Sequence, residues 1–301
     1  MRRLSIYLFG SMRIEIDGVN VEEGLPPTVQ DLLAYLLLHR RRTHSREVLA
    51  NLLWGGYPQE RARNCLNTAI WRLRRILEPE GTSQGTYLMS TSTGEVSFNA
   101  AGDFWLDVAA FEETLDRDLL SLAKNATSFH VEALTQAVKL YIGDLLEGRY
   151  SDWVLFERER LRIGYLDALY HLMCYFYVTN NFAQTLAYGR QILNSDPLRE
   201  DVHRQVMRAY MKNGQRALAV KQYNHCRDML AAELGIAPML ETQELLKQIL
   251  ETGSTPAEAS AQDAMKLQSL AQLHLAMESV ETARKNIQQL IEMFGPDSVP
   301  G

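Results

Sequence analysis

The stretch ERARNCLNTAIWRLRRIL, residues 60–77, decides how the first third of this 301-residue chain folds. Its apolar residues recur at the spacing of one helical face, which predicts a helix from about Glu60 to Leu77 that ends before Pro79. The apolar stripe consists of Leu66, Ile70, Leu73 and Leu77. The opposite face carries arginine, asparagine and threonine side chains, so we expect it at the surface.

Short strands are predicted on both sides of this helix. The sequences LSIYLFG (4–10) and MRIEIDGV (12–19) contain β-branched and aromatic residues separated by turn signals, which predicts a small antiparallel sheet. After the helix, TYLMSTSTGEVSF (86–98) predicts a hairpin around Thr93 and Gly94.

Two further helices are predicted between the first strands and the central helix. A Pro-Pro pair at 26–27 opens VQDLLAYLLLHR (29–40), whose apolar residues follow helical spacing. The next helix is REVLANLLW (46–54), and Thr43 or Ser45 can cap its N-terminus. The predicted order is therefore strands, three helices and a hairpin.

From Asp107 onward only helical patterns remain, which places a domain boundary near residues 100–106. Asn180 and Gly214 lie 34 residues apart, each at a predicted turn between two helices, and 34 residues is the tetratricopeptide period. Small and aromatic packing positions are predicted at Ala219 and Tyr223, and in an earlier unit at Ala137 and Tyr141. Stacked helical hairpins are expected, since one hairpin cannot bury its own apolar face.

The C-terminal region contains a predicted linker and a tail without a motif. The linker, residues 251–262, is small and polar. Helical periodicity returns in the tail, residues 263–301, which can cap the repeats, fold back on them or make an intermolecular contact.

Charge is distributed unevenly along the chain. The formal net charge is −6, but residues 1–104 hold 12 arginines, no lysine and 11 acids and are slightly positive. Hydrophobic residues make up 46% and charged residues 23%, which is typical of folded globular domains. No apolar run of transmembrane length occurs, so we expect a protein of the cytoplasm without membrane contact.

Nothing in the sequence predicts catalysis, a metal or a cofactor. Cys65, Cys174 and Cys226 are too far apart for a disulfide framework or a CxxC pair. The sequence contains no HExxH, GxSxG, GxxxxGK[ST] or calcium-loop pattern. Asp152 and Glu157, beside the WVLF string, are predicted to be charges on a helix surface. We therefore expect no enzymatic activity.

Three strings resemble the bacterial transcriptional activator domain: DVAAFEETL (107–115), GDLLEGRYSDWVLFERERLR (143–162) and ELGIAPMLETQELLKQIL (233–250). The preceding strands, helices and hairpin resemble a winged helix of the OmpR/PhoB type. This pair, in this order, resembles the Streptomyces antibiotic regulatory protein (SARP) family. The expected fold is an α+β winged-helix domain (1–104) followed by an all-α tetratricopeptide-like domain (105–250).

The resemblance implies that the helix at 60–77 enters the major groove of DNA. Matching it to the family's recognition helix places Asn64, Asn67, Thr68 and Trp71 near bases, and Arg72 and Arg74 near phosphates or guanine edges. Further contacts are expected from Arg61 and Arg63 at the helix start and from Arg75 on the outward face. The alternatives are that the arginines are ordinary solvated charges and that Trp71 packs against a strand.

The predicted wing departs from the family pattern. Ser92 stands near the position of a family arginine that reaches the minor groove, Thr93 is at the turn, and Glu95 lies beside the tip. Repulsion between Glu95 and phosphate is expected to weaken this contact. Residues 40–42, all arginine, can face the DNA backbone or RNA polymerase, or can stabilise the end of a helix.

The expected function is transcription regulation, as an activator that binds direct-repeat DNA half-sites and contacts RNA polymerase, as a homodimer or in tandem. One alternative is a protein-interaction scaffold whose winged helix no longer binds DNA. Another is a regulator gated by a small molecule, with a pocket formed by Tyr170, Met173, Tyr177 and Tyr210.

Overall fold

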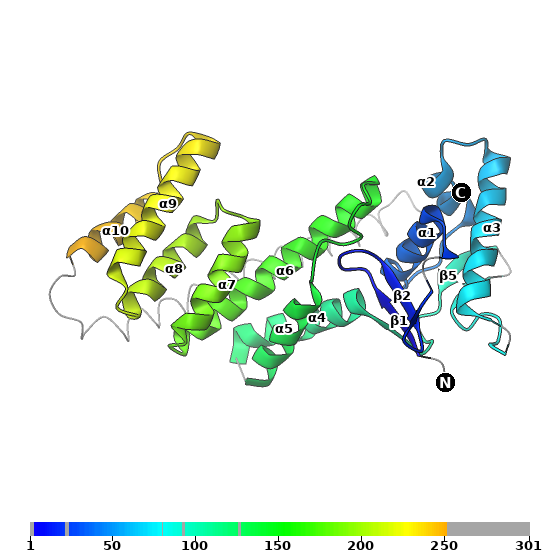
Figure 1. The fold of residues 1–301 in the computed structure, drawn as a ribbon, viewed down its shortest axis with the longest axis horizontal. Coiled ribbons are helices and arrows are strands. Elements are labelled where there is room, and N and C mark those ends of the chain that lie inside the picture. The colour runs from blue at the N-terminus through cyan, green and yellow to red at the C-terminus, as the bar shows by residue number, and fades with distance from the viewer. Residues whose placement is uncertain (1–2, 22–23, 80, 92–93, 126–127, 252–301) are drawn as a thin grey trace, which may run out of the picture. The chain divides into compact units, whose positions relative to one another are not determined.

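The computed structural model describes residues 3–21, 24–79, 81–91, 94–125 and 128–251 (Figure 1). The chain forms two compact units, and the first of them is discontinuous in sequence. Unit 1 contains the residues up to 113 together with 139–162, and unit 2 contains residues 114–138 and those from 163 onward. Within the described ranges, no helix is long and apolar enough to cross a membrane.

Unit 1 begins with the predicted strands, three helices and hairpin, and the predicted order is confirmed. The elements are β1 (Leu4–Tyr7), β2 (Arg13–Ile16), β3 (Val19–Asn20), α1 (Pro27–Leu38), α2 (Arg46–Trp54), α3 (Gln59–Leu77), β4 (Leu88–Ser90), β5 (Val96–Phe98) and β6 (Phe104–Leu106). Helices α4 (Asp107–Asn125) and α6 (Asp152–Val178) each contribute one end to this unit, and it also includes the last two residues of α5 (Ser128–Leu140).

The main sheet has the order β3-β2-β1-β6, and β4 and β5 form a separate hairpin. The predicted antiparallel pairing of β1 with β2 is confirmed, with Leu4 opposite Ile16. β6 was not predicted as a strand: it pairs in parallel with β1, and Leu4 lies opposite Phe104. Three residues are too few to show an alternating pattern, so β6 could not be predicted from its own sequence. Its pairing with β1, which is distant in the sequence, makes it a strand.

The three helices begin and end where local signals place them. Prolines occupy the start of α1, and the Ser45 hydroxyl accepts a hydrogen bond of 3.3 Å from the Glu47 N–H at the start of α2. Ser45, rather than Thr43, is therefore the cap. The predicted apolar stripe of α3 is buried, and it also includes Ala62 and Ala69.

The end of β1 is covered by segments distant in sequence. Phe9 is buried, and its ring centroid lies 5.3 Å from that of Phe111 in α4 and 4.8 Å from that of Tyr141. The backbone N–H of Leu146 donates to the Leu8 carbonyl at 2.9 Å. The prediction that Tyr141 packs inside a repeat was wrong: it follows the end of α5 and packs in unit 1.

Unit 2 consists of helical hairpins, as predicted. Besides the remaining parts of α4 and α6, its helices are α5 (Ser128–Leu140), α7 (Phe182–Ser195), α8 (Glu200–Lys212), α9 (Arg216–Leu234) and α10 (Leu240–Glu251). Asn180 and Gly214 lie at the α6–α7 and α8–α9 turns with φ of 59° and 71°, which confirms the 34-residue repeat. The packing positions Ala219 and Tyr223 are buried.

Helices α7 and α8 approach each other closely at Gly189. A Cβ atom at this position would lie 2.5 Å from Val206 Cγ2, so only glycine permits this spacing without a shift. The predicted linker and tail lie outside the described residues, apart from Glu251, which is the last residue of α10.

Candidate nucleic-acid interface

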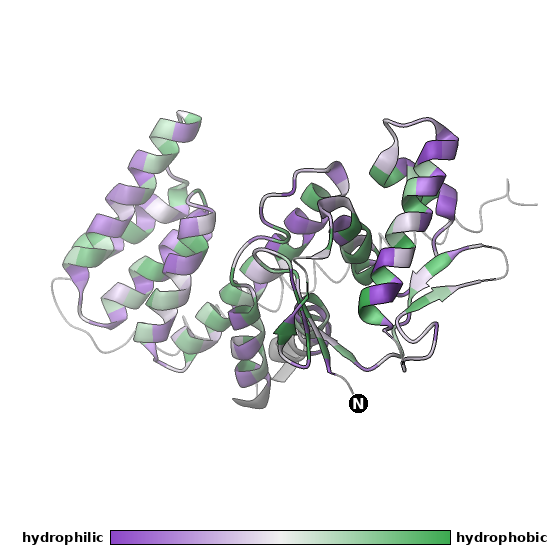
Figure 2. Cartoon of the chain, turned by 45° about the vertical axis from the view of Figure 1, so that its right-hand side comes forward, coloured by the Kyte–Doolittle hydropathy of each residue, from purple (hydrophilic) through white to green (hydrophobic). Residues whose placement is uncertain are grey.

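The outward face of α3 is polar, basic and exposed, and it lies opposite the buried stripe. Figure 2 shows that hydrophilic and hydrophobic residues alternate along this helix. The exposed residues of the outward face are Arg61, Arg63, Asn64, Asn67, Thr68, Trp71, Arg72 and Arg75. Trp71 is 57% exposed, so its ring is not packed into the sheet, and the Arg75 guanidinium lies 5.4 Å from the ring centroid. Eight of the eleven residues predicted for the site therefore share one surface.

Some of these side chains already have partners within the protein. The Thr68 hydroxyl donates to the Asn64 carbonyl of its own helix at 2.9 Å, and the Arg61 guanidinium lies 4.4 Å from the centre of the Tyr57 ring. In contrast, Arg63 and Arg72 form no hydrogen bond or ion pair with another described residue. These two arginines are the most available for an external anion.

Arg74 differs from the other arginines of α3 because it is half-buried. Its Nη2 atom donates to the Leu88 carbonyl at 3.3 Å and to the Ser90 hydroxyl at 2.9 Å. The side chain therefore braces α3 against strand β4 of the hairpin. The match to the family's recognition helix had implied that Arg74 lies near phosphates or guanine edges.

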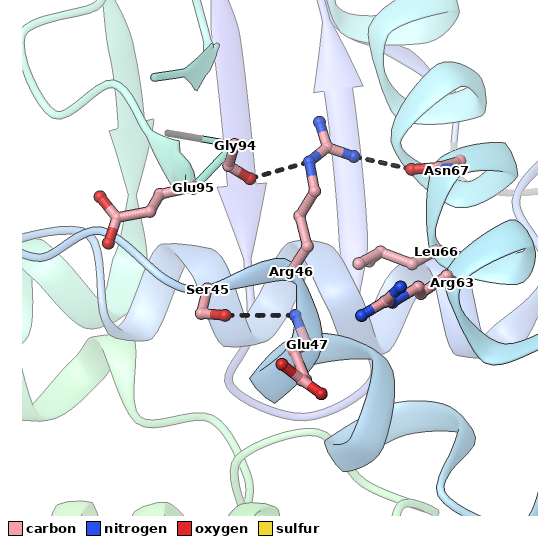
Figure 3. A pocket seen from close by; sticks show the side chains of 8 residues that line it. All are labelled: Ser45, Arg46, Glu47, Arg63, Leu66, Asn67, Gly94 and Glu95. Carbon is pink, nitrogen blue, oxygen red and sulfur yellow. Dashed lines mark hydrogen bonds between the residues drawn. The ribbon is translucent and has the colours of Figure 1, made fainter. Parts of the chain in front are cut away.

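A small pocket lies between the start of α2, the middle of α3 and the hairpin turn (Figure 3). Its lining consists of Ser45, Arg46, Glu47, Arg63, Leu66, Asn67, Gly94 and Glu95. Arg46 crosses it: Nε donates to the Gly94 carbonyl at 2.9 Å, and Nη1 donates to Asn67 Oδ1 at 2.7 Å. Sequence reasoning missed Arg46, since no local pattern indicates that the start of α2 lies beside α3 and the hairpin.

The hairpin is anchored to the connection between α1 and α2. The His44 N–H donates to the Val96 carbonyl at 2.9 Å, and the Val96 N–H donates to the His44 carbonyl at 2.8 Å. Gly94 has a φ of 85°, a conformation that favours glycine. The predicted wing residues Ser92 and Thr93 lie outside the described residues.

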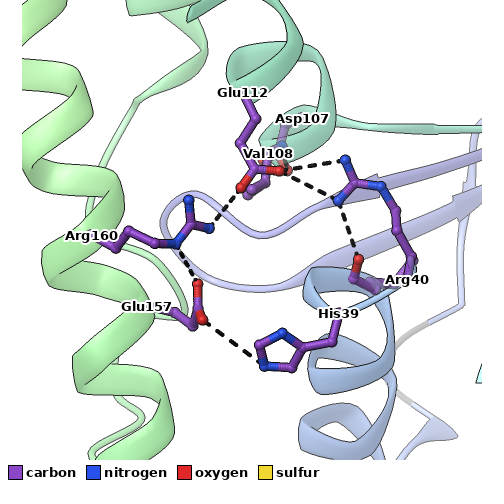
Figure 4. Close-up of polar contacts among 8 residues, drawn as sticks. His39, Arg40, Asp107, Val108, Glu112, Glu157 and Arg160 are labelled. Carbon is purple, nitrogen blue, oxygen red and sulfur yellow. Dashed lines mark hydrogen bonds and ion pairs between the residues drawn. The ribbon is translucent and has the colours of Figure 1, made fainter. Parts of the chain in front are cut away.

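Arg40 belongs to an ionic cluster inside unit 1 (Figure 4). It donates to the Leu37 carbonyl at 3.3 Å and to the Glu112 carboxylate at 3.4 Å, and Glu112 also accepts from Arg160 at 2.6 Å. The interpretation that this arginine stabilises a helix end is therefore confirmed, while its neighbours Arg41 and Arg42 are exposed.

Glu157 completes the cluster, and the prediction that it is a surface charge was wrong. Its side chain is buried, accepts from Arg160 Nε at 2.8 Å and lies 3.9 Å from His39 Nε2. Burial is the main cause that lowers the pKa of His39, although Glu157 acts in the opposite direction. Asp152, in contrast, is exposed as predicted.

The residues suggested for a small-molecule pocket are part of the helical core. Met173 and Tyr177 are buried, and Tyr170 and Tyr210 pack against the same cluster. Among the described residues, no group of three or more histidine, cysteine or acidic side chains is placed to hold a metal ion.

Comparison with known proteins assigns both parts of the chain. Residues 106–250 match the family model of the bacterial transcriptional activator domain, and residues 21–94 match that of the transcriptional regulatory protein C-terminal domain. The chain belongs to the SARP-type transcriptional regulators. This assignment agrees with the sequence resemblance and with the observed order of a winged helix and helical repeats.

Relatives of this SARP-type chain are named as regulatory proteins. It is 29% identical over 259 residues to the regulatory protein AfsR of Streptomyces coelicolor, covering 84% of this chain and 25% of AfsR. It is 25% identical over 253 residues to the transcriptional regulatory protein MoaR1 of Mycobacterium tuberculosis, covering 81% of this chain and 78% of MoaR1. The chain thus spans about a quarter of AfsR but most of MoaR1.

A solved structure shares the fold of this SARP-type regulator. The structure of Mycobacterium tuberculosis EmbR in complex with a low-affinity phosphopeptide superimposes with a TM-score of 0.76 at 21% sequence identity. The match covers 93% of this chain and 72% of that chain.

Proposed function

We propose that this chain is a transcription regulator that binds specific DNA sequences through α3. The observation that carries the proposal is the two-sided character of that helix. A continuous apolar stripe fixes α3 in the core of unit 1, and its opposite face presents long hydrogen-bond donors to solvent. A helix with such a face fits the major groove, where base edges are read by polar side chains.

The basic residues involved are all arginine. Residues 59–77 contain five arginines and one acidic residue, although the chain as a whole is acidic. The planar guanidinium group can donate two parallel hydrogen bonds to phosphate or to the edge of guanine. We assign Arg63 and Arg72 the leading roles, since neither is engaged by the described part of the protein.

We further propose that the chain acts as an activator, as a dimer or as two copies on adjacent direct repeats. Glu95 beside the wing turn opposes phosphate and limits the affinity of a single copy, so two linked binding events would compensate. In this proposal residues 1–104 bind DNA and residues 105–250 mediate assembly in the cytoplasm. The exposed Arg41 and Arg42 are candidates for contact with RNA polymerase.

The test combines sequence selection with salt titration. Fragments of the source genome that the full chain retains are sequenced, and affinity for the enriched site is measured at several salt concentrations. Arg63→Ala and Arg72→Ala should each weaken binding and reduce the slope of log affinity against log salt by about one. The control is Arg227→Ala, which removes an exposed arginine from α9 in unit 2.

Two outcomes would overturn the proposal. If Arg63→Ala and Arg72→Ala bind with the same affinity and salt slope as Arg227→Ala, α3 does not contact DNA. If the unmodified chain enriches no motif, the alternative of a protein-interaction scaffold is favoured instead.

A further inference from the structure

Asn67 is predicted to contact bases, but one of its two amide atoms already forms a hydrogen bond within the protein. Its Oδ1 atom accepts a hydrogen bond of 2.7 Å from Arg46 Nη1 (Figure 3). The same guanidinium donates from Nε to the Gly94 carbonyl at 2.9 Å. Arg46 is thus held at two points, between the hairpin turn and the exposed face of α3.

The chemistry of arginine determines which amide atom faces it. A guanidinium has five N–H donors and no acceptor, so only the carbonyl oxygen of Asn67 can be its partner. The bond is short and charge-assisted, which makes rotation of the amide costly. The Nδ2 group, on the other branch of the planar amide, is therefore directed away from Arg46.

This polarity matters for base recognition. Asparagine recognises adenine by accepting from N6 with its oxygen while donating to N7 with its nitrogen. Arg46 occupies one of the two lone pairs of this oxygen and holds the oxygen toward the pocket, so the amide atom directed to DNA is the Nδ2 donor. A donor pairs with base edges that present acceptors in the major groove, which are N7 and O6 of guanine and O4 of thymine.

We propose that Arg46 is a positioning residue for specificity, which fixes Asn67 as a hydrogen-bond donor and directs it to guanine or thymine rather than adenine. The inference rests on the proposed DNA binding by α3. Asn64, one turn earlier on the same helix, provides the contrast. Its side-chain amide forms no hydrogen bond with another described residue and can present either atom.

The experiment compares the binding motifs selected from random DNA by variants of the full chain. Asn67→Ala identifies the motif position that this side chain reads, since only that position should lose its preference. Arg46→Met keeps the aliphatic stem but removes every donor, so Asn67 can rotate. Adenine should then rise at that same position by about tenfold relative to the unmodified chain, within the range of one bidentate contact.

Three controls separate positioning from loss of charge or fold. Arg63→Met removes an arginine from the same pocket without touching Asn67, and should lower affinity while the preference at the marked position stays unchanged. Arg46→Lys keeps a charged donor and should retain the original preference. In the double variant Arg46→Met with Asn67→Ala, the adenine gain should vanish, since the effect passes through Asn67.

The result expected is guanine or thymine at the marked position in the unmodified chain and adenine in Arg46→Met. Adenine in the unmodified chain, no change with Arg46→Met, no position marked by Asn67→Ala, or an adenine gain that survives in the double variant would each overturn the inference. Absence of any motif in the unmodified chain would instead reject the proposed DNA binding.

Discussion

His203 is fully buried in α8, and both of its ring nitrogens have partners. Nε2 lies 3.0 Å from the Pro197 carbonyl oxygen, which can only accept, so Nε2 carries the hydrogen. Nδ1 lies 2.7 Å from Gln222 Nε2 and accepts from it. The neutral ring therefore satisfies both contacts, and burial is the main cause that lowers its pKa below the usual 6.5.

This lowered pKa predicts how His203 affects stability as the pH changes. Below pH 6.5 the unfolded chain takes up a proton on this residue before the native state does, so its contribution to stability is lost as the pH falls. In His203→Gln the residue cannot titrate. The stability advantage of the unmodified chain over His203→Gln, measured by urea unfolding, should shrink from pH 7.5 to pH 5. An advantage that grows would contradict the assignment.

At the scale of the elements, Asp107 connects the start of α4 to the end of β1. Its carboxylate accepts from the N–H groups of Leu8 at 2.8 Å, Phe9 at 3.0 Å and Val108 at 2.7 Å. Burial is the largest influence on this carboxyl and raises its pKa to about 6, although the three donors act in the opposite direction.

Asp107→Asn should therefore destabilise unit 1. The amide keeps one acceptor and turns a donor toward backbone N–H groups, so at least one buried N–H loses its partner at a cost of about 1–3 kcal/mol. The free energy of unfolding should be measured at pH 8, where the carboxylate of the unmodified chain is ionised. Asp103→Asn changes a nearby exposed carboxyl and should have little effect. Equal stability of the two variants would show that the protein does not need both carboxylate oxygens of Asp107 as acceptors.

At the scale of the molecule, the winged helix does not end where the three helices and the hairpin end. Leu8 and Phe9 are buried by α4 and by the segment before α6, more than 90 residues further along the chain. Arg158 holds that segment by donating to the Leu145, Leu146 and Arg149 carbonyls at 2.9–3.0 Å. Unit 1 therefore depends on residues that sequence analysis placed in the second domain.

The winged helix should unfold at a markedly lower temperature in a fragment of residues 1–104 than in a fragment of residues 1–251, which contains all of unit 1. Each large apolar side chain that loses its cover costs roughly 1.5–3 kcal/mol, so exposing Leu8 and Phe9 removes about 3–6 kcal/mol. That is a large part of the stability of an ordinary domain. Circular dichroism during thermal unfolding is the measurement. Equal unfolding temperatures would show that residues 105–162 do not stabilise the winged helix.

Much of this protein was determined by the sequence alone. The stripe of α3, the start of α2 and the 34-residue spacing of Asn180 and Gly214 follow from residues close together in the chain. Local periodicity and turn chemistry specify such features without knowledge of the rest of the fold. They were sufficient to predict the order of the elements and the exposed face that forms the candidate site.

Only the tertiary structure decided which side chains on that face are available. Arg74 is engaged by strand β4, and Asn67 accepts from Arg46, which lies 21 residues earlier in the chain. Elsewhere in unit 1, Asp107 is buried against the end of β1. β6 is a strand only because it lies beside β1. These contacts join residues distant in sequence, and a pattern read along one chain contains no information on which distant donors and acceptors will meet.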